Sequence, residues 1–176
     1  MRLLFEIDTK DYDPNGKAFI RPSSRSIIIR GQTVAMVHSQ KYDYYKFPGG
    51  GIEPNERKED ALIRETLEEA GLVICPDTIQ EYGYVHRVQR TDRTDADYFV
   101  QDNYYYLCEA EDALVEQKLD DYESEEKFVL EFVSPHHAIA ANRTIDHGPK
   151  DPHMIEREAK VLELLLQEGY FKDVSC

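Results

Sequence analysis

Apolar residues along the chain form short clusters separated by polar and glycine-containing turns, which predicts several strands and a few helices. Runs rich in β-branched and aromatic residues predict strands at residues 3–7, 26–30, 33–38, 79–85, 99–109 and 128–133. No internal repeat or linker-like tract divides the 176 residues, so we expect a single domain over residues 1–176.

Helix signals follow the first strands and close the chain. Pro48 and the glycine triplet at residues 49–51 are expected to break regular structure before a helix that starts at Asn55 or Glu56 and is ended by Gly71. Two further helices are predicted after Ser134-Pro135 and Asp151-Pro152, because each pair places an N-cap residue before a proline. The second of these has apolar residues at helical spacing up to a stop at Gly169.

Composition and charge narrow the functional classes. The formal net charge of −14 opposes binding to duplex nucleic acid or to anionic lipid, and no apolar run is long enough to cross a membrane. The start of the chain is too acidic for an export signal, and three widely spaced cysteines form no zinc or disulfide pattern. We therefore expect a cytoplasmic protein, in which a small anionic substrate needs a divalent cation to bridge the like charges.

Three glutamates on the first predicted helix are the candidate chemistry. Glu65, Glu68 and Glu69 fall within one arc of about 100° on a helical projection, where like charges repel. A divalent cation would offset this repulsion, and carboxylate oxygens select Mg²⁺ or Mn²⁺ over zinc or copper. The alternative interpretation is a solvated acidic helix face without a metal.

The spacing of charged and glycine residues decides between these interpretations. Gly50 is followed after five residues by Glu56, after seven more by Arg64-Glu65, and then by Glu68-Glu69 and Gly71-Leu72. This resembles the Nudix box, G-x5-E-x7-R-E-U-x-E-E-x-G-U, in which U is a bulky aliphatic residue. One position departs from the pattern, because Thr66 places a hydroxyl where the box has an aliphatic side chain.

The resemblance implies a fold and an activity. The family fold is an α/β/α sandwich around a mixed β-sheet, and family members hydrolyse a nucleoside diphosphate linked to another group. Carried over to this chain, the metal ligands are Glu65, Glu68, Glu69 and the carbonyl of Gly49. The resemblance further implies that Glu65 and Arg64 are catalytic residues and that an ion pair between Arg64 and Glu56 fixes the loop and aims Glu65. Gly50, Glu56 and Gly71 would form the scaffold of the box.

Many members of the family use a further acid on a later loop, just before a strand that leads into a W-V-S/P-like turn. Here Phe132-Val133-Ser134-Pro135 resembles that turn, and we assign the acid to Glu126. Glu123 and Glu125 compete for this role, and a purely solvated acidic run is the alternative for the segment.

Substrate preference is open at this level. Arg87 and Arg90 lie in an unusually basic segment and are candidates to contact phosphate, and Tyr84 is a candidate to stack on a base. The alternative for each is an exposed loop charge or a half-buried sheet aromatic. The proline or tyrosine that marks ADP-ribose or dinucleoside-polyphosphate subfamilies is missing at the corresponding positions.

We predict a metal-dependent pyrophosphohydrolase of a small nucleotide or related diphosphate. Two alternatives share the fold: a regulatory module that binds a nucleotide without cleaving it, and an isomerase of the isopentenyl-diphosphate type. The intact carboxylate set argues against the first, and the lack of a cysteine near the box argues against the second. The oligomeric state is open between a monomer and a homodimer.

Overall fold

The computed structural model describes residues 1–171. Its helices are α1 (Lys58–Ala70), α2 (Asp121–Glu126), α3 (Pro135–Thr144), α4 (Pro152–Gln167) and the 3₁₀ turn η1 (Pro76–Thr78). Its strands are β1 (Leu3–Asp8), β2 (Ala18–Ile20), β3 (Ser23–Ile27), β4 (Ile29–Arg30), β5 (Thr33–Ser39), β6 (Tyr44–Lys46), β7 (Gly49–Gly51), β8 (Leu72–Ile74), β9 (Gln80–Arg90), β10 (Tyr98–Leu107), β11 (Ala110–Leu114) and β12 (Phe128–Val133).

The largest sheet is mixed and has the strand order β1-β9-β10-β3-β7, with β2 also paired to β10. Strand β10 runs antiparallel to β9 and parallel to both β2 and β3, which lie in succession along the same edge of β10. A second sheet contains β12, β5 and β4, with β6 on β5, and a third joins β11 to β8.

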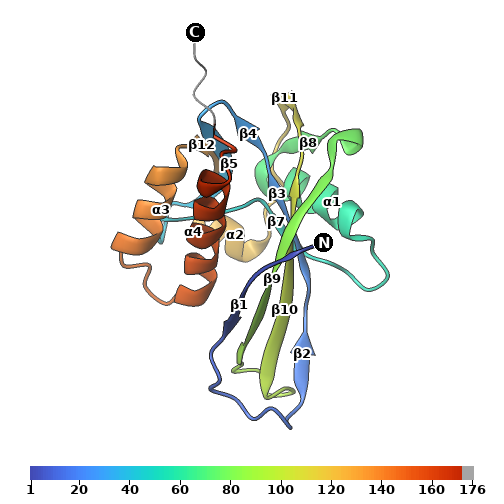
Figure 1. Cartoon of the computed structure of the whole chain (residues 1–176), viewed down its shortest axis with the longest axis vertical. Coiled ribbons are helices and arrows are strands. Elements are labelled where there is room, and N and C mark those ends of the chain that lie inside the picture. The colour runs from blue at the N-terminus through green and yellow to red at the C-terminus, as the bar shows by residue number, and fades with distance from the viewer. Residues whose placement is uncertain (172–176) are drawn as a thin grey trace.

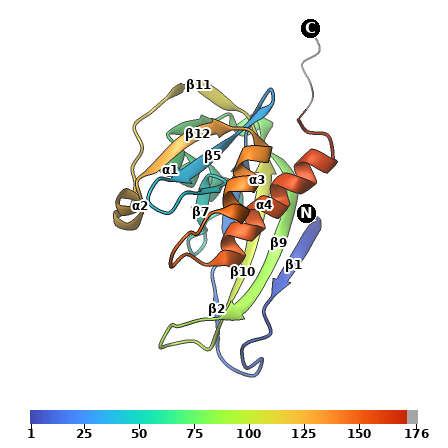
Figure 2. The ribbon, with the colours of Figure 1, turned by 90° about the vertical axis from the view of Figure 1, so that its left-hand side faces the viewer.

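Helices cover the sheets from two sides, so the expected α/β/α layering is confirmed (Figure 1). Helix α1 packs on β3 and β7, while α3 and α4 pack against each other and on β6. Figure 2 shows the α3 and α4 pair from the side, in front of β9 and β10. The apolar core is accordingly divided into two clusters, one of which contains Leu162 of α4 and the other Leu62 of α1.

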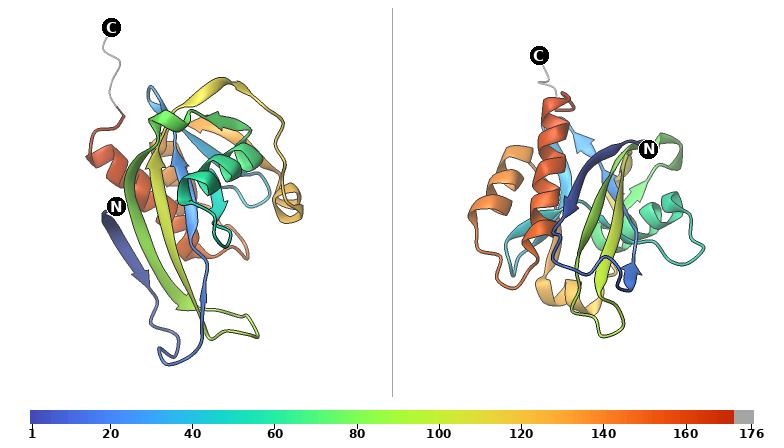
Figure 3. Two further views of the ribbon diagram at one scale, coloured as in Figure 1. Left: turned by 90° about the vertical axis from the view of Figure 1, so that its right-hand side faces the viewer. Right: turned by 60° about the horizontal axis from the view of Figure 1, so that its bottom comes forward.

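One end of the large sheet extends beyond the helices as an arm formed by β1, β2 and the β9–β10 hairpin (Figure 3). Aromatic pairs hold this arm together: Tyr12 stacks on Tyr98 with ring centroids 4.9 Å apart, and Phe19 packs on Phe99 at 5.9 Å. Strand β10 pairs first with β2 in the arm and then with β3, the strand on which α1 packs, so β10 connects the arm to the region of the box helix.

Most predicted elements are present, with informative differences. The strand at residues 128–133 is confirmed to the residue, and α4 ends at Gln167, two residues before Gly169, which adopts a positive φ of 76°. The predicted strand at residues 26–30 is divided into β3 and β4. The prediction that the glycine triplet breaks regular structure was wrong, because Gly49–Gly51 forms β7 and pairs with β3.

Two further observations concern the sequence predictions. Cys75 and Cys108 are free thiols, and Cys176 lies outside the described residues. No helix between residues 1 and 171 combines the length and apolar character that a membrane crossing requires.

Candidate functional site

A buried polar strand positions helix α1. Ser24 and Ser26 of β3 face the helix: the Ser24 hydroxyl donates to the Lys58 carbonyl at 2.8 Å, and the Ser26 hydroxyl accepts from Thr66 at 3.0 Å. The Ser26 hydroxyl also donates to the Pro48 carbonyl at 3.3 Å. The hydroxyl of Thr66, the one departure from the box pattern, therefore has a buried partner and links the helix to the loop before the box.

Gly49 and Glu69 join that loop to the helix. The Gly49 N–H donates to Glu69 Oε2 at 2.9 Å, and a Cβ at Gly49, whose φ is 138°, would overlap the Ser24 carbonyl oxygen. Glu69 is only 1% exposed and forms a buried ion pair with Lys46. Burial raises the pKa of the Glu69 carboxyl, and the positive charges of Lys46 and Arg25 oppose that rise.

Arg64 and Glu56 form the predicted scaffold. Arg64 Nε and Nη2 donate to the two oxygens of Glu56 at 2.8 and 2.9 Å, and Nη2 also donates to the Gly51 carbonyl at 3.1 Å. Glu56 Oε2 accepts a further bond from the Glu53 N–H at 2.9 Å. The Arg64 hydrogen bonds lower the pKa of Glu56, so the pair stays charged and fixes the loop over the first turns of α1.

Glu65 lies under the box glycines. Its Oε1 accepts from Arg64 Nη1 at 2.6 Å, while its Oε2 occupies the place that a Cβ on Gly50 would fill. Burial raises the pKa of Glu65 above its ordinary value, although Arg64 opposes the rise. A partly desolvated carboxylate with a raised pKa has the properties of a proton acceptor.

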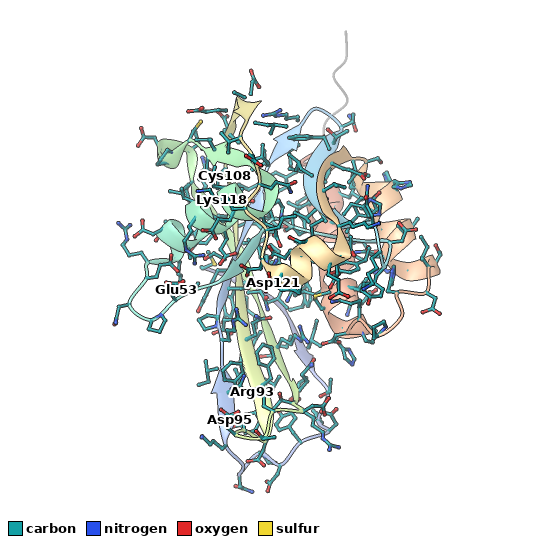
Figure 4. The ribbon with its side chains drawn as sticks, turned by 180° about the vertical axis from the view of Figure 1, so that it is seen from behind. Glu53, Arg93, Asp95, Cys108, Lys118 and Asp121 are labelled. Atoms are coloured by element: carbon teal, nitrogen blue, oxygen red, sulfur yellow. The ribbon has the colours of Figure 1, made fainter. Side chains whose placement is uncertain are left out.

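Arg64, Glu65 and Glu69 line a pocket of about 740 Å³ next to α1. Its acidic side chains are Glu53, Glu65, Glu68, Glu69, Asp120 and Glu123. The basic side chains are Arg21, Arg64 and Lys118, so carboxylates outnumber cations two to one. Figure 4 shows Glu53 on the loop that leads into α1, and Lys118 and Asp121 on the segment that approaches from β11.

The segment before α2 closes one side of the pocket. The Lys118 N–H donates to the Glu68 carbonyl at 2.7 Å, which brings Lys118 to the end of α1. Asp120 and Glu123 form a capping box in which the Asp120 N–H donates to Glu123 Oε2 at 2.9 Å. This acidic stretch was expected to be a loop, but it forms α2, and the Asp120-to-Glu123 spacing is itself a helix-start signal.

The three candidate acids of this segment point in different directions. Glu123 lines the pocket with the box glutamates, whereas Glu125 is exposed and pairs with Lys41. Glu126 is buried and accepts from Ser39 at 3.0 Å and from Tyr44 at 2.8 Å, besides its ion pair with Lys150. Of the three candidates Glu123, Glu125 and Glu126, Glu123 is thus the one that lines the box pocket.

The predicted substrate-binding residues lie away from the box pocket. Tyr84 packs on Tyr104 with ring centroids 5.8 Å apart, and Arg90 borders a shallow site on the arm. Arg87 is buried on the other side of the sheet, where it pairs with Asp151. Arg25, which the sequence analysis missed, donates from Nη1 to the Gly49 carbonyl at 2.8 Å, the same oxygen that the box resemblance assigns to a metal.

The donor set suits a hard divalent cation, because the acidic groups of the pocket offer only oxygen ligands. Within residues 1–171 no three acidic, histidine or cysteine side chains are already gathered closely enough to hold a metal ion. Of the three box glutamates, Glu65 and Glu68 have the less committed oxygens: Glu65 Oε2 lies against Gly50, and Glu68 makes one 3.3 Å bond to Arg64. Glu69 is held by Lys46 and Gly49.

Comparisons with known proteins agree with this geometry. A sequence model described as NUDIX domain matches residues 20–157. Diphosphoinositol polyphosphate phosphohydrolase 3-alpha from Mus musculus and its Homo sapiens counterpart are each 37% identical over 68 residues, which is 36% of this chain and 40% of each relative. The match thus spans less than half the length of these curated relatives.

Solved structures show the same fold. A NUDIX hydrolase from Nitrosomonas europaea superposes with a TM-score of 0.55 at 17% identity, covering 78% of this chain and 87% of that one. A MutT NUDIX hydrolase from Burkholderia pseudomallei gives a TM-score of 0.52 at 17% identity, covering 82% and 98%. At these identities the likeness concerns the fold alone.

Proposed function

Because the chain belongs to the NUDIX domain family, we propose that it is a Mg²⁺- or Mn²⁺-dependent hydrolase that cleaves a diphosphate bond in a nucleotide or another small diphosphate. The observation that carries the proposal is the excess of carboxylates in the box pocket, where Glu65 offers an oxygen beside Gly50 of β7 and Glu68 lines the same pocket. This charge excess favours a divalent cation, and through it a phosphate-bearing ligand, in a chain of net charge −14.

The residues of the box pocket have separate roles in the proposed reaction. Glu65 accepts the proton of the attacking water, and Arg64 holds the Glu65 carboxylate in place through its 2.6 Å bond. Glu65 and Glu68 would hold the cation, with Glu69 as a further ligand that would have to share its carboxylate with Lys46. A cation bound there would polarise phosphoryl oxygens and make a water more acidic.

Two cations line the same pocket without an ion pair in the described part of the chain. Arg21 packs its guanidinium against Gly51, and Lys118 is held at the end of α1 by its backbone bond to Glu68. We propose that both side chains bind the negatively charged oxygens of the diphosphate. The match at residues 20–157, with β1 and α4 completing the same layers, supports our proposal that the chain forms one Nudix domain.

The test is turnover by Glu65→Gln against a panel of nucleotides, nucleotide sugars, dinucleotides and diphosphoinositol phosphates, with and without Mg²⁺. The last class is included because of the names of the curated relatives. Glu59→Gln, in the first turn of the same helix, is the matched control. We expect turnover only with metal, and a loss of about a hundredfold or more for Glu65→Gln with an unchanged circular dichroism spectrum. Wild-type turnover by folded Glu65→Gln, or ligand binding by the wild type without any cleavage, would overturn the proposal.

A further inference from the structure

A second pocket, of about 350 Å³, lies on the face of β3 opposite to helix α1. Side chains alternate along a strand, so Arg25 points away from the helix that its neighbours Ser24 and Ser26 contact. Around Arg25 the pocket gathers Arg87 of β9, Arg157 of α4 and Lys150 of the preceding loop. Four basic side chains thus meet in one pocket of a chain that carries 35 acidic and 21 basic residues.

The positive charge of this pocket is only partly balanced. Arg157 pairs with Glu158, Lys150 with Glu126, and Arg87 with Asp151. Of these three acids, Asp151 is the one that lines the pocket.

Arg25 stays without a carboxylate partner in the described structure. Its Nη1 donates to the carbonyls of Phe47 and Gly49 at 3.2 and 2.8 Å, and neither oxygen carries a full charge. The residue is only 8% exposed, and its Nε is buried without any hydrogen-bond partner. A buried guanidinium N–H without an acceptor is costly, so the site favours a ligand that supplies one.

The arginines also repel one another. Burial, together with the charges of Arg157 and Arg25, lowers the pKa of Arg87 to about 10. A bound anion would relieve this repulsion and satisfy the free N–H of Arg25 at the same time.

We propose that this second pocket binds a phosphate group of the substrate, one that is not part of the diphosphate cleaved at the box. The proposal rests on the proposed function and narrows its substrate class to small diphosphates that carry at least one further phosphate. Arg25 makes the connection, because the guanidinium that would face this phosphate also bonds the Gly49 carbonyl of the box loop. Phosphate is favoured over a carboxylate because its tetrahedral oxygens can accept from guanidinium groups approaching from several sides.

Binding of inorganic phosphate tests the pocket directly. The titration uses ¹⁵N-labelled full-length protein with EDTA at constant ionic strength and follows the arginine Nε–H resonances. We expect saturable binding that shifts the Arg25 signal, weakened about tenfold in Arg87→Gln because a charged donor is lost. Asp151→Asn should instead tighten binding severalfold, since it removes the competing carboxylate and keeps an N-cap residue at the start of α4. Arg93→Gln, which changes an exposed residue at the tip of the arm, is the control and should bind as wild type (Figure 4).

Arg87→Gln and Asp151→Asn are expected to change the phosphate affinity in opposite directions, and a loss of structure would not do so. No saturable binding, equal weakening by Arg93→Gln, or weakening by Asp151→Asn would overturn the proposal, as would acetate competing as well as phosphate. These measurements need neither metal nor turnover, so phosphate binding should persist in Glu65→Gln, and its failure is distinct from failure of the hydrolase assignment. Once a substrate is known, Arg87→Gln should raise KM for a diphosphate bearing an extra phosphate and leave KM for its dephosphorylated analogue unchanged.

Discussion

The Arg64 guanidinium holds both oxygens of Glu56, eight residues earlier in the chain, through bonds of 2.8 and 2.9 Å. The same guanidinium bonds Glu65 and the Gly51 carbonyl, so one side chain sets the position of the loop and of the proposed proton acceptor together. A planar fork is needed for this arrangement, and an ammonium group cannot reproduce it.

Arg64→Lys should therefore lower kcat about ten- to a hundredfold while the protein remains folded, because displacements near 1 Å at a reacting group have effects of that order. Arg57→Lys is the control, since Arg57 is exposed and its contact to Glu59 is 3.7 Å long. The comparison is kcat at saturating Mg²⁺ together with the melting temperature of each variant. Equal kcat in both variants would show that the Arg64 fork has no positioning role.

Gly50→Ala should weaken Mn²⁺ binding with little change in stability. The added Cβ would overlap the Glu65 carboxylate, which is the mobile end of a side chain, so the carboxylate moves and the backbone does not. Gly51→Ala is the matched control, because its Cβ would meet only the end of Arg21. Calorimetric titration of Mn²⁺ into both variants makes the test, and an unchanged affinity in Gly50→Ala would count against Glu65 as a ligand.

Glu123→Gln should affect turnover, whereas Glu126→Gln should affect folding stability. Glu123 lines the box pocket, and glutamine is also accepted at its position in a capping box, so we expect slower turnover and an unchanged melting temperature. Glu126 is buried among Ser39, Tyr44 and Lys150, so its loss of charge should cost about 1–3 kcal/mol of folding free energy.

Urea unfolding and kcat, measured on the same two preparations, distinguish these outcomes. A graded loss of turnover in Glu126→Gln without destabilisation would restore the sequence-based assignment of the second acid to Glu126. Turnover equal to wild type in Glu123→Gln would remove Glu123 from the site.

Local spacing predicted the box and its helix, because glycines and charges at fixed offsets depend on one loop and one helix. Strand β3 escaped prediction over most of its length, since the residues Ser23 to Ser26 are polar yet fully buried, and their partners come from distant segments. The short strands β6 and β7 were missed for a similar reason: Lys46 and the glycines take part in pairing that only the neighbouring strands supply.

The basic pocket could not be predicted either, because its arginines come from β3, β9 and α4, which lie far apart in the chain. Arg87 was singled out for its charge, but nothing near it in the sequence indicates that it meets Arg25 and Arg157. Residue type suggested the chemistry of these groups, while the sheet order decided which of them share a pocket.

Glu158→Gln should destabilise the fold by about 3–5 kcal/mol, the usual effect of breaking a buried ion pair on one side. The Glu158 carboxylate accepts from Arg157 Nε at 2.8 Å and from the Phe47 N–H at 2.8 Å, and is fully buried between α4 and the loop before the box. Its removal would leave the Arg157 charge buried without its carboxylate partner. Urea unfolding at neutral pH measures the difference, with Glu156→Gln on the exposed face of α4 as the control.

The pH dependence of stability supplies a second, independent test of the same pair. Burial is the largest single influence on Glu158 and opposes its ionisation, but the charges of Arg157 and Arg25 and the hydrogen bonds from Phe47 and Arg157 together outweigh it, so the pKa of Glu158 is lowered in the folded protein from its ordinary 4.5. A lowered folded-state pKa means that the stabilisation is fully present above pH 4.5 and is lost as the pH falls towards the folded-state value. Wild type and Glu156→Gln should therefore lose stability in this acid range more steeply than Glu158→Gln, whose free energy of unfolding lacks this contribution. Parallel pH profiles for all three proteins would show that Glu158 and Arg157 do not form the charged pair described.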